Sequence, residues 1–352
     1  MDTKNVHLAD YVWLDGATPT QELRYKTRIF DFESGTPSLD HFSEWSFDGS
    51  STNQATGDNS DCILQPVFFC KNPLHKQNRW VVLCEVLNSD GTPHQSNQRA
   101  LLRKSMKDFG AKHEPYVGFE QEYTLFYKDS PLGWPENGYP APQGPFYCGV
   151  GASVVSGRDL VEEHTACCIE AGLNIYGTNA EVMLGQWEFQ IGPRGVSDEK
   201  CDPLTMSDHS WIARFFLHAI SEKHGVKVSF SNKPMFGDWN GAGMHTNFST
   251  KEMRTQEKGL AAINEAVKHL ENNHRKHIEG YGYGLSDRLT GLHETCSIND
   301  FKSGVSDRGA SIRIPLSTSK KGFGYLEDRR PGANSDPYVV SNLLVSSICA
   351  GS

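Results

Sequence analysis

The sequence lacks the features that place a chain in a membrane or on a nucleic acid. Its longest apolar runs, such as residues 67–70 and 80–84, are far shorter than the roughly 20 residues that a membrane-spanning helix needs. No dense run of Lys and Arg is present, and the formal net charge is −9. An acidic chain without a basic patch is not typical of a nucleic-acid scaffold. We therefore expect neither a membrane nor a nucleic acid as a partner.

Targeting signals and cysteine motifs are also missing. The N-terminal segment carries acids, no apolar core and no enrichment in Arg and Ser, so neither a signal peptide nor a transit peptide is indicated. The nine cysteines contain no C-x-x-C pair. This pattern disfavours a disulfide framework and a zinc knuckle, and it predicts reduced, mostly buried thiols. We expect a cytoplasmic location.

Glycine-rich phosphate-binding motifs of the Walker A and kinase types are absent as well. The phosphates of any bound nucleotide must then be held by metal ions and arginines. The C-terminal third supplies such arginines, namely Arg288, Arg308, Arg313, Arg329 and Arg330. Because an Asp directly precedes three of them, local ion pairs remain an alternative for each arginine, and particularly for Arg330.

Turn-forming residues divide the N-terminal 95 residues into short apolar runs, which predicts strands and loops. The expected strands are residues 10–15, 23–32, 67–70 and 80–87. A first helix is expected to begin with Ser96 as its N-cap and to end near residue 112. We therefore expect a small β-rich domain over residues 1–95 and a larger domain over residues 96–352.

The larger domain is predicted to alternate strands with helices at residues 159–171, 203–224 and 259–277. Asp202 provides a cap and Gly225 a stop for the second of these helices. Strands with one acidic and one apolar face favour a mainly antiparallel sheet, open to a site on one face and covered by helices on the other. The predicted fold class is α+β.

Two glutamates in a β-prone segment give the first indication of a site. Glu120 and Glu122 are spaced so that both leave the same face of a strand. Two buried acids side by side repel, and at least one pKa rises unless a cation neutralises them. The pair fits a divalent metal site or an acid and a base. Taken alone, it fits a solvated strand face better.

The pattern recurs farther along the chain. Glu188 lies between two aromatic residues, where an acid is unusual, and His245 follows a glycine-rich loop, although a lone histidine there more often belongs to a core. The full set of metal-type ligands is Glu120, Glu122, Glu181, Glu188, His245 and Glu327. Five carboxylates and one imidazole favour Mg²⁺ or Mn²⁺ over zinc. Two divalent ions would nearly neutralise the five acids.

At these residues the chain resembles the glutamine synthetases, specifically the eukaryotic-type class II enzymes. The motifs that carry the resemblance span nearly the whole chain, at residues 13–16, 46–52, 240–250, 308–315 and 327–331. The resemblance implies a β-grasp-like N-terminal domain and a larger catalytic domain. It also implies the ATP-dependent ligation of ammonia to the side-chain carboxylate of L-glutamate through γ-glutamyl phosphate, giving L-glutamine, ADP and phosphate.

The resemblance further implies cofactors. ATP is the co-substrate, and each site holds two ions of Mg²⁺ or Mn²⁺, or three where another ion accompanies the nucleotide. The implied ligands of one ion are Glu122, Glu181 and Glu188. Those of the other ion are Glu120, His245 and Glu327.

Other site residues follow from the resemblance alone. Asp48 resembles the residue that takes a proton from ammonium, Glu294 the flap acid that closes the site, and Arg329 a residue that contacts the transferred phosphoryl group. The implied glutamate-binding residues are Asn240, Gly241, Arg288, Arg308 and Arg329. The implied ATP-binding residues are Tyr116, Ser249, Arg254, Arg308, Arg313 and Tyr325. Relatives often have Trp where this chain has Tyr116, and without the resemblance Asp48 fits better as a turn residue.

The family also implies a homo-oligomer, a decamer of two pentameric rings, in which Asp48 of one subunit reaches the site of its neighbour. Two rival interpretations stay open. One is another ATP-dependent γ-glutamyl ligase, which takes an amine or cysteine in place of ammonia. The other is a catalytically silent relative, which the complete ligand set disfavours.

Overall fold

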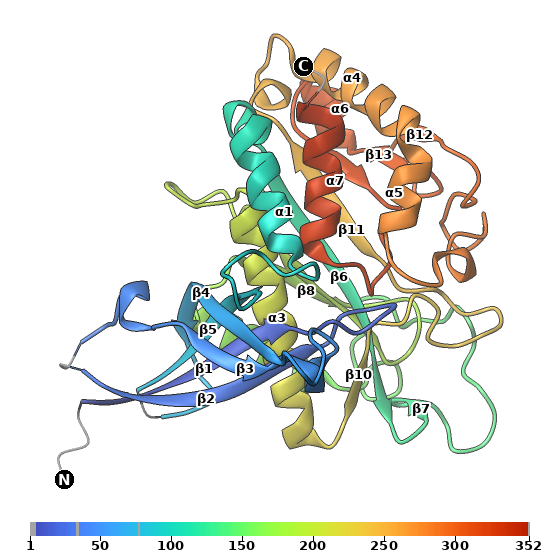
Figure 1. Cartoon of the computed structure of the whole chain (residues 1–352). Coiled ribbons are helices and arrows are strands. Elements are labelled where there is room, and N and C mark those ends of the chain that lie inside the picture. The colour runs from blue at the N-terminus through green and yellow to red at the C-terminus, as the bar shows by residue number, and fades with distance from the viewer. Residues whose placement is uncertain (1–4, 33–34, 77, 351–352) are drawn as a thin grey trace. The chain divides into compact units, whose positions relative to one another are not determined.

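The computed structural model of the chain describes residues 5–32, 35–76 and 78–350 (Figure 1). The chain divides into two compact units. The first unit extends to Leu101 and includes Ala166–Leu173. The second unit comprises Leu102–Thr165 and the chain from Asn174 onward.

The first unit is built on a five-stranded sheet in the order β2-β1-β5-β4-β3. Its strands are β1 (Val6–Leu14), β2 (Leu23–Asp31), β3 (Trp45–Asp48), β4 (Asp61–Lys71) and β5 (Arg79–Leu87). β1 and β5 pair in parallel, and the other neighbours are antiparallel. Inward side chains of these strands form an aromatic core that includes Tyr11, Trp13 and Phe47. The four strands expected from the sequence are present, and β3 is an addition.

β4 is longer than its apolar run predicts, because it begins at Asp61 rather than at residue 67. Pro66 lies inside it, and a proline in a strand interior normally argues against pairing on both sides. The register with β5 shifts between Pro66 and Phe68. This irregularity accommodates the proline without ending the strand.

The second unit contains a nine-stranded sheet. Seven strands follow the order β12-β13-β14-β11-β6-β9-β8, while β7 and β10 both pair with β6. The strands are β6 (Tyr116–Tyr127), β7 (Ser130–Pro131), β8 (Ile175–Ala180), β9 (Gln186–Ile191), β10 (Lys227–Ser229), β11 (Met244–Ser249), β12 (Ser303–Val305), β13 (Ile312–Ile314) and β14 (Leu326–Asp328). Among these described strands, β12 and β13 pair in parallel and the other neighbours pair antiparallel. The expected, mainly antiparallel sheet is confirmed.

Helices pack behind this sheet and give the predicted α+β class. The α-helices among the described residues are α1 (Gln98–Ser105), α2 (Arg158–Glu170), α3 (Pro203–His224), α4 (Gly259–Asn272), α5 (His274–Gly280), α6 (Leu316–Lys321) and α7 (Pro337–Cys349). α3 packs on β6, β9 and β10, and α7 packs on α3, α4 and α5. α3 has the predicted bounds, with the Asp202 side chain accepting from two backbone N–H groups and Gly225 left-handed at φ 64°.

The beginning of α1 corrects the predicted cap. The Asn97 side chain accepts the N–H of Ala100 at 3.0 Å, whereas Ser96 Oγ lies 2.8 Å from His94 Nδ1. The expected cap at Ser96 is therefore wrong. Serine and asparagine are both good caps, so the two positions could not be ranked from residue type. The α-helix gives way at Ser105 to a π-type turn over Met106–Gly110 and a 3-10 turn over Ala111–His113, so the helical segment ends close to the predicted residue 112.

The predicted helix over residues 259–277 is two helices. Asn273 separates α4 from α5 with φ −105° and ψ 11°, and its Nδ2 donates to the carbonyl of His269 at 2.8 Å. An asparagine that bonds the nearby backbone competes with helix continuation in this way. The prediction of one continuous helix is wrong at this residue.

The cysteines behave as expected. All nine are free, and seven of them are buried, with Cys148 exposed and Cys296 partly exposed. Within the described ranges, no helix has the length and apolar character that crossing a membrane requires.

Candidate functional site

Strand register brings the predicted acids together on one face of the second unit's sheet. Glu120 of β6 pairs with His245 of β11, and Glu122 of β6 pairs with Glu188 of β9. β14 adds Glu327 on the other side of β11. Since alternate residues of a strand share a face, this pairing by itself places these side chains on the same face of the sheet.

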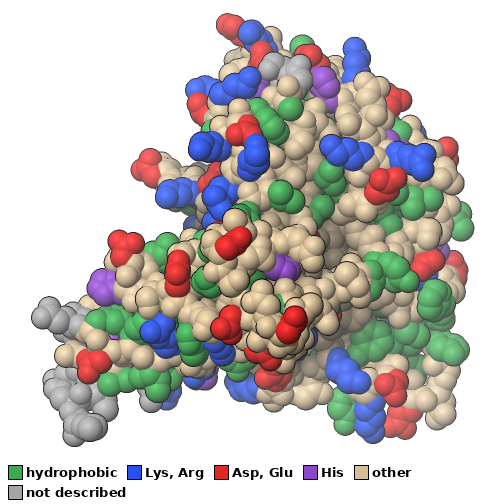
Figure 2. Space-filling model, viewed as in Figure 1, with side chains coloured by type: hydrophobic (Ala, Val, Ile, Leu, Met, Phe, Trp, Pro, Cys, Tyr) green, Lys and Arg blue, Asp and Glu red, His purple; other side chains and the backbone are tan. Residues whose placement is uncertain are grey.

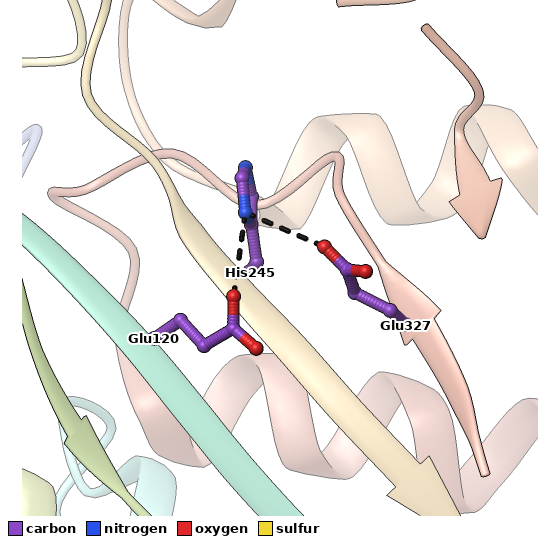
Figure 3. A group of neighbouring side chains, drawn as sticks. All are labelled: Glu120, His245 and Glu327. Carbon is purple, nitrogen blue, oxygen red and sulfur yellow. Dashed lines mark ion pairs between the residues drawn. The ribbon is translucent and has the colours of Figure 1, made fainter. Parts of the chain in front are cut away.

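The first cluster consists of Glu120, His245 and Glu327 (Figure 3). His245 Nδ1 lies 3.7 Å from a Glu120 oxygen and 3.5 Å from a Glu327 oxygen. Burial, followed by the positive charges of Arg329 and Arg288, lowers the pKa of His245 well below its usual value, so the imidazole is neutral. A neutral nitrogen and two carboxylates that share a space offer three ligand atoms to a cation.

The second cluster consists of Glu122, Glu181 and Glu188, whose ligand oxygens all lie within 4.8 Å of one another. Glu181 stands just after β8 and reaches the group from a turn. Burial is the first cause that raises the pKa of each acid, and neighbouring carboxylates add to it. The pKa of Glu181 rises to about 8 and that of Glu188 rises well above its usual value. The cluster is therefore poorly suited to carry its full negative charge alone.

Three amides support the acids, and sequence analysis missed their role. Asn247 Nδ2 donates to Glu120 at 2.8 Å, Asn179 Nδ2 to Glu181 at 2.8 Å, and Gln190 Nε2 to Glu188 at 2.5 Å. Asn247 and Gln190 each stand two residues from a predicted ligand on the same strand face. That spacing was the available signal, but an amide carries no charge that marks it as part of a metal-type set.

Arginines surround the clusters. Glu327 accepts from Arg313 at 2.7 Å and from Arg329 at 2.6 Å. Arg288 is buried, and its Nη2 lies 2.9 Å from His245 Nε2 and donates to the carbonyl of Arg329. A Cβ on Gly243 would lie too close to Arg288 Nη2, so any larger residue at this position would displace the guanidinium.

These side chains line one cavity of about 210 Å³, formed by residues of the second unit alone. It includes all six ligand residues. The other predicted residues along it are Asn240, Gly241, Arg288, Glu294, Arg308, Arg313 and Arg329. The lining residues that were not predicted are Tyr147, Asn179, Val182, Gln190, His293 and Thr295. The cavity is polar and strongly charged, which suits small ionic substrates.

The structure does not bring four of the predicted ATP-binding residues to the cavity wall. Three of them form their own cluster, in which Arg254 Nη1 donates to Ser249 Oγ at 2.9 Å and the guanidinium lies 3.8 Å from the Tyr116 ring centre. Tyr325 is the fourth, and its side chain is 40% exposed. One face of the Tyr116 ring is thus covered by an arginine.

Asp48 belongs to the first unit, at the end of β3. Its Oδ1 accepts from the Ser50 N–H at 3.0 Å and from Ser50 Oγ at 2.6 Å, and its Oδ2 accepts from Ser51 Oγ at 2.7 Å. These bonds, those from Ser50 first, lower the pKa of Asp48. The turn that the alternative interpretation expected is present, and it keeps an exposed carboxylate ionised.

A buried network lies behind the strand that carries Glu327. Asp328, which lies between Glu327 and Arg329 in the sequence, is paired with Arg330 at 2.7 Å and accepts a hydrogen bond from the Tyr281 hydroxyl at 2.8 Å. His277 Nδ1 lies 2.6 Å from the same hydroxyl. The ion-pair alternative raised for Arg330 is therefore correct, and this arginine is absent from the cavity wall.

Comparisons with known proteins agree with the geometry. Residues 5–89 match the family model described as glutamine synthetase, beta-Grasp domain, and residues 91–281 match glutamine synthetase, catalytic domain. A glutamine synthetase of Streptomyces viridochromogenes is 52% identical over 97% of this chain and 96% of the relative. The glutamine synthetase of Saccharomyces cerevisiae is 49% identical over 99% and 91%. A chloroplastic glutamine synthetase of Chlamydomonas reinhardtii is 50% identical over 97% and 90%.

Proposed function

The chain belongs to the glutamine synthetase family and makes glutamine from glutamate, ammonia and ATP, and we propose that its charged cavity is where this reaction occurs. The observation that carries the proposal is the pair of three-ligand clusters opening into one cavity. A silent relative would have no reason to keep buried acids whose ionisation burial opposes.

The clusters fit two divalent ions. We assign Glu122, Glu181 and Glu188 to one ion, and Glu120, His245 and Glu327 to the other. Oxygen-rich ligand sets suit Mg²⁺ or Mn²⁺, and a cation relieves the repulsion that raises the pKa values of the buried acids. When bound, such ions would neutralise phosphate charge and polarise phosphoryl oxygens. A third ion would have to be held mainly by the nucleotide.

The arginines and the glycine loop would position glutamate. We assign glutamate binding to Asn240, Gly241, Arg288, Arg308 and Arg329, all of which line the cavity. The planar guanidinium suits carboxylate and phosphate oxygens. Although burial lowers the pKa of Arg288 to about 10, this side chain stays cationic near neutral pH. Arg329, already bonded to Glu327, would also contact the phosphoryl group in transfer.

Nucleotide binding would extend from the cavity to the cluster around Tyr116. The residues assigned are Tyr116, Ser249, Arg254, Arg308, Arg313 and Tyr325. Arg254 covers one face of the Tyr116 ring, so a base could stack on the opposite face. Tyr116 is 38% exposed, which leaves ring surface available.

The reaction would take place in two steps. A side-chain oxygen of glutamate attacks the terminal phosphorus of ATP, ADP leaves, and γ-glutamyl phosphate forms. Asp48, held ionised by its serine hydrogen bonds, takes a proton from ammonium. The ammonia nitrogen then attacks the γ-carbonyl carbon, the bond to the phosphate oxygen breaks, and the phosphate leaves as hydrogen phosphate with the proton that the new amide nitrogen loses. Glu294 closes the cavity over these steps.

We further propose a homo-oligomer, a decamer of two pentameric rings in the cytoplasm. Asp48 lies in the first unit and the residues that line the cavity belong to the second, and we assign the Asp48 that serves each cavity to a neighbouring subunit. Large apolar side chains are exposed at Val150 (88%), Phe236 (78%) and Tyr139 (71%). Figure 2 shows hydrophobic side chains gathered where Figure 1 places β7 and β10. Exposed apolar groups of this kind mark interaction surfaces.

The domain boundary near residue 95 is also part of the proposal. The two family models meet between residues 89 and 91, and the first compact unit extends to Leu101. A boundary between these positions lies just before or within the beginning of α1.

The function is tested by measuring phosphate release and glutamine formation with glutamate, ATP and ammonium, omitting each in turn. Full phosphate release should require all three substrates and a divalent metal. A parallel reaction with cysteine or an amine in place of ammonium tests the rival ligase. Preferential use of either compound over ammonium would contradict the proposal.

A further inference from the structure

The segment from Thr290 to Ser297 forms a miniature hairpin beside the cavity. Thr290 and Ser297 are bridged in antiparallel fashion, and Thr295 N–H donates to the Leu292 carbonyl at 3.2 Å. We call this segment the flap hairpin. Its tip presents Glu294 to the cavity.

Both central residues of the tip are left-handed, with φ 52° at His293 and φ 61° at Glu294. This is the pattern of a type I′ turn, which normally takes Asn and Gly at these positions. Histidine and glutamate have side chains that clash with the backbone in this region, so the conformation is costly. Such strain persists only where surrounding contacts hold it.

Contacts on two sides hold the tip. Glu294 Oε2 lies 3.7 Å from Arg308 Nη1, and the Glu294 carbonyl accepts from Arg329 Nη2 at 3.5 Å. On the other side, His293 Nε2 lies 3.1 Å from Asp238 Oδ1. The Asp238 carboxylate is separate from the groups assigned to substrate, because Asp238 does not line the cavity.

Asp238 belongs to a well-anchored loop. The next residue, Trp239, packs its ring 5.0 Å from that of Trp134 and 5.4 Å from that of Tyr139. The two residues after it, Asn240 and Gly241, line the cavity. The loop that is assigned to glutamate therefore touches the flap hairpin through one side-chain contact.

We propose that Asp238 is a positioning residue, whose contact with His293 holds the strained flap tip over the cavity and protects the acyl phosphate from water. This inference rests on the proposed function. If the tip is released, a water oxygen attacks the γ-carbonyl carbon, the bond to the phosphate oxygen breaks, and glutamate and phosphate are formed. ATP is then consumed without a matching amount of glutamine.

The test compares glutamine formed with phosphate released at saturating glutamate and ATP and limiting ammonium. In the unaltered enzyme the two amounts should match. Asp238→Ala should lower the ratio by about two- to five-fold, which is the shift in a closed–open equilibrium that one exposed side-chain contact supports. The KM for glutamate and the melting temperature should stay unchanged. Asp238→Asn keeps an acceptor oxygen and should restore most of the ratio.

Two further variants exclude indirect effects. Asp129→Ala removes a fully exposed loop aspartate with its own lysine partner at 3.9 Å, away from the cavity wall, and should leave the ratio unchanged. His293→Ala removes the imidazole that contacts Asp238 and leaves the left-handed tip strained, so it should lower the ratio as Asp238→Ala does. The double variant should be no worse than either single one.

Additive losses in the double variant would overturn the inference, because Asp238 would then act through Lys233 on its own loop, whose pKa is lowered by burial and only partly restored by the Asp238 charge. An unchanged ratio in Asp238→Ala would overturn it too. A different result, in which the unaltered enzyme makes no glutamine from these substrates, would instead refute the proposed function.

Discussion

Glu181 and Glu188 illustrate how single residues of the cavity depend on their surroundings. Burial raises the pKa of both, and neighbouring carboxylates raise it further. An acid in this position costs free energy when ionised and recovers it when a cation binds. The native state should therefore be measurably more stable with a divalent ion than without one.

We expect millimolar Mg²⁺ or Mn²⁺ to raise the melting temperature, because the ions bind the folded cavity and not the unfolded chain. At a hundred times the dissociation constant the gain is about 2.7 kcal/mol. Glu188→Gln removes one charge from the crowded cluster, so it should blunt this gain. The measurement is calorimetric melting with metal and with a chelator. Superimposable curves for the unaltered protein would contradict the expectation.

Single-residue predictions worked where charge marked the position. Glu120 and Glu122 could be placed on one face from their spacing alone, and Glu188 stood out among aromatic neighbours. Asn247 and Gln190 could not be singled out, because an amide in a strand has no such mark until the register shows which acid it faces. The strained tip at His293 could not be predicted either, since the sequence has no glycine or asparagine there to indicate a type I′ turn.

At the scale of elements, two strands of the cavity, β6 and β14, are anchored by a residue adjacent to a site acid. Gln121, between two site glutamates of β6, accepts from the buried Arg214, which has carbonyl partners in addition. Asp328 of β14 is paired with the buried Arg330. Removing one partner of a buried pair leaves the other charge uncompensated.

We expect Arg330→Met to lower the free energy of unfolding by about 3–5 kcal/mol, because Asp328 would remain charged and buried. Arg275→Met is the matched control, since it breaks an ion pair whose arginine is 93% exposed. The control should cost at most about 1 kcal/mol. Urea unfolding of the three proteins gives the comparison. Equal losses in the two variants would mean that the buried network contributes nothing specific.

Element prediction succeeded where local signals agreed with packing. α3 has an aspartate cap, a proline in its first turn and a glycine stop, and all three act as expected. α7 was not predicted, because its apolar residues leave little amphipathic contrast, and a helix buried on most sides lacks the period that reveals it. The sheet order was also out of reach, since it depends on pairing between segments far apart in the sequence.

Considered as a whole, the molecule carries histidines that the fold keeps neutral. Burial lowers the pKa of His164 and of His209 to about 4 and that of His277 to about 3. In the unfolded chain each would bind a proton near pH 6.5. Below that pH the unfolded chain binds more protons than the folded one, so acidification favours unfolding.

We expect stability to fall by up to roughly 1.4 kcal/mol per pH unit for each of these histidines below about pH 6.5. His164→Gln keeps a donor for the Ala213 carbonyl, which His164 Nε2 contacts at 2.9 Å, and should flatten the slope by one histidine's share. The raised pKa values of the cavity acids act in the opposite direction. The test is therefore the difference between the slopes of unfolding free energy against pH for the unaltered protein and for His164→Gln. Parallel slopes would contradict it.

Shared sites between subunits should be visible by mixing inactive chains. Asp48→Asn keeps the turn cap but removes the proposed base, and Glu188→Gln removes one acid of the second cluster. If neighbouring subunits complete each other's sites, co-refolded mixtures should regain a fraction of activity, because some interfaces join two intact halves. Light scattering should show an oligomer. A fully active monomer would refute the shared site.

β6 contributes one ligand to each cluster, Glu120 to the first and Glu122 to the second. Residues two apart on a strand are separated by about 6.6 Å along its axis. The backbone geometry of the strand, rather than the choice of side chains, therefore sets the distance between the positions from which Glu120 and Glu122 reach their clusters. Point substitutions in β6 can weaken either cluster, but they cannot change the distance between these two strand positions.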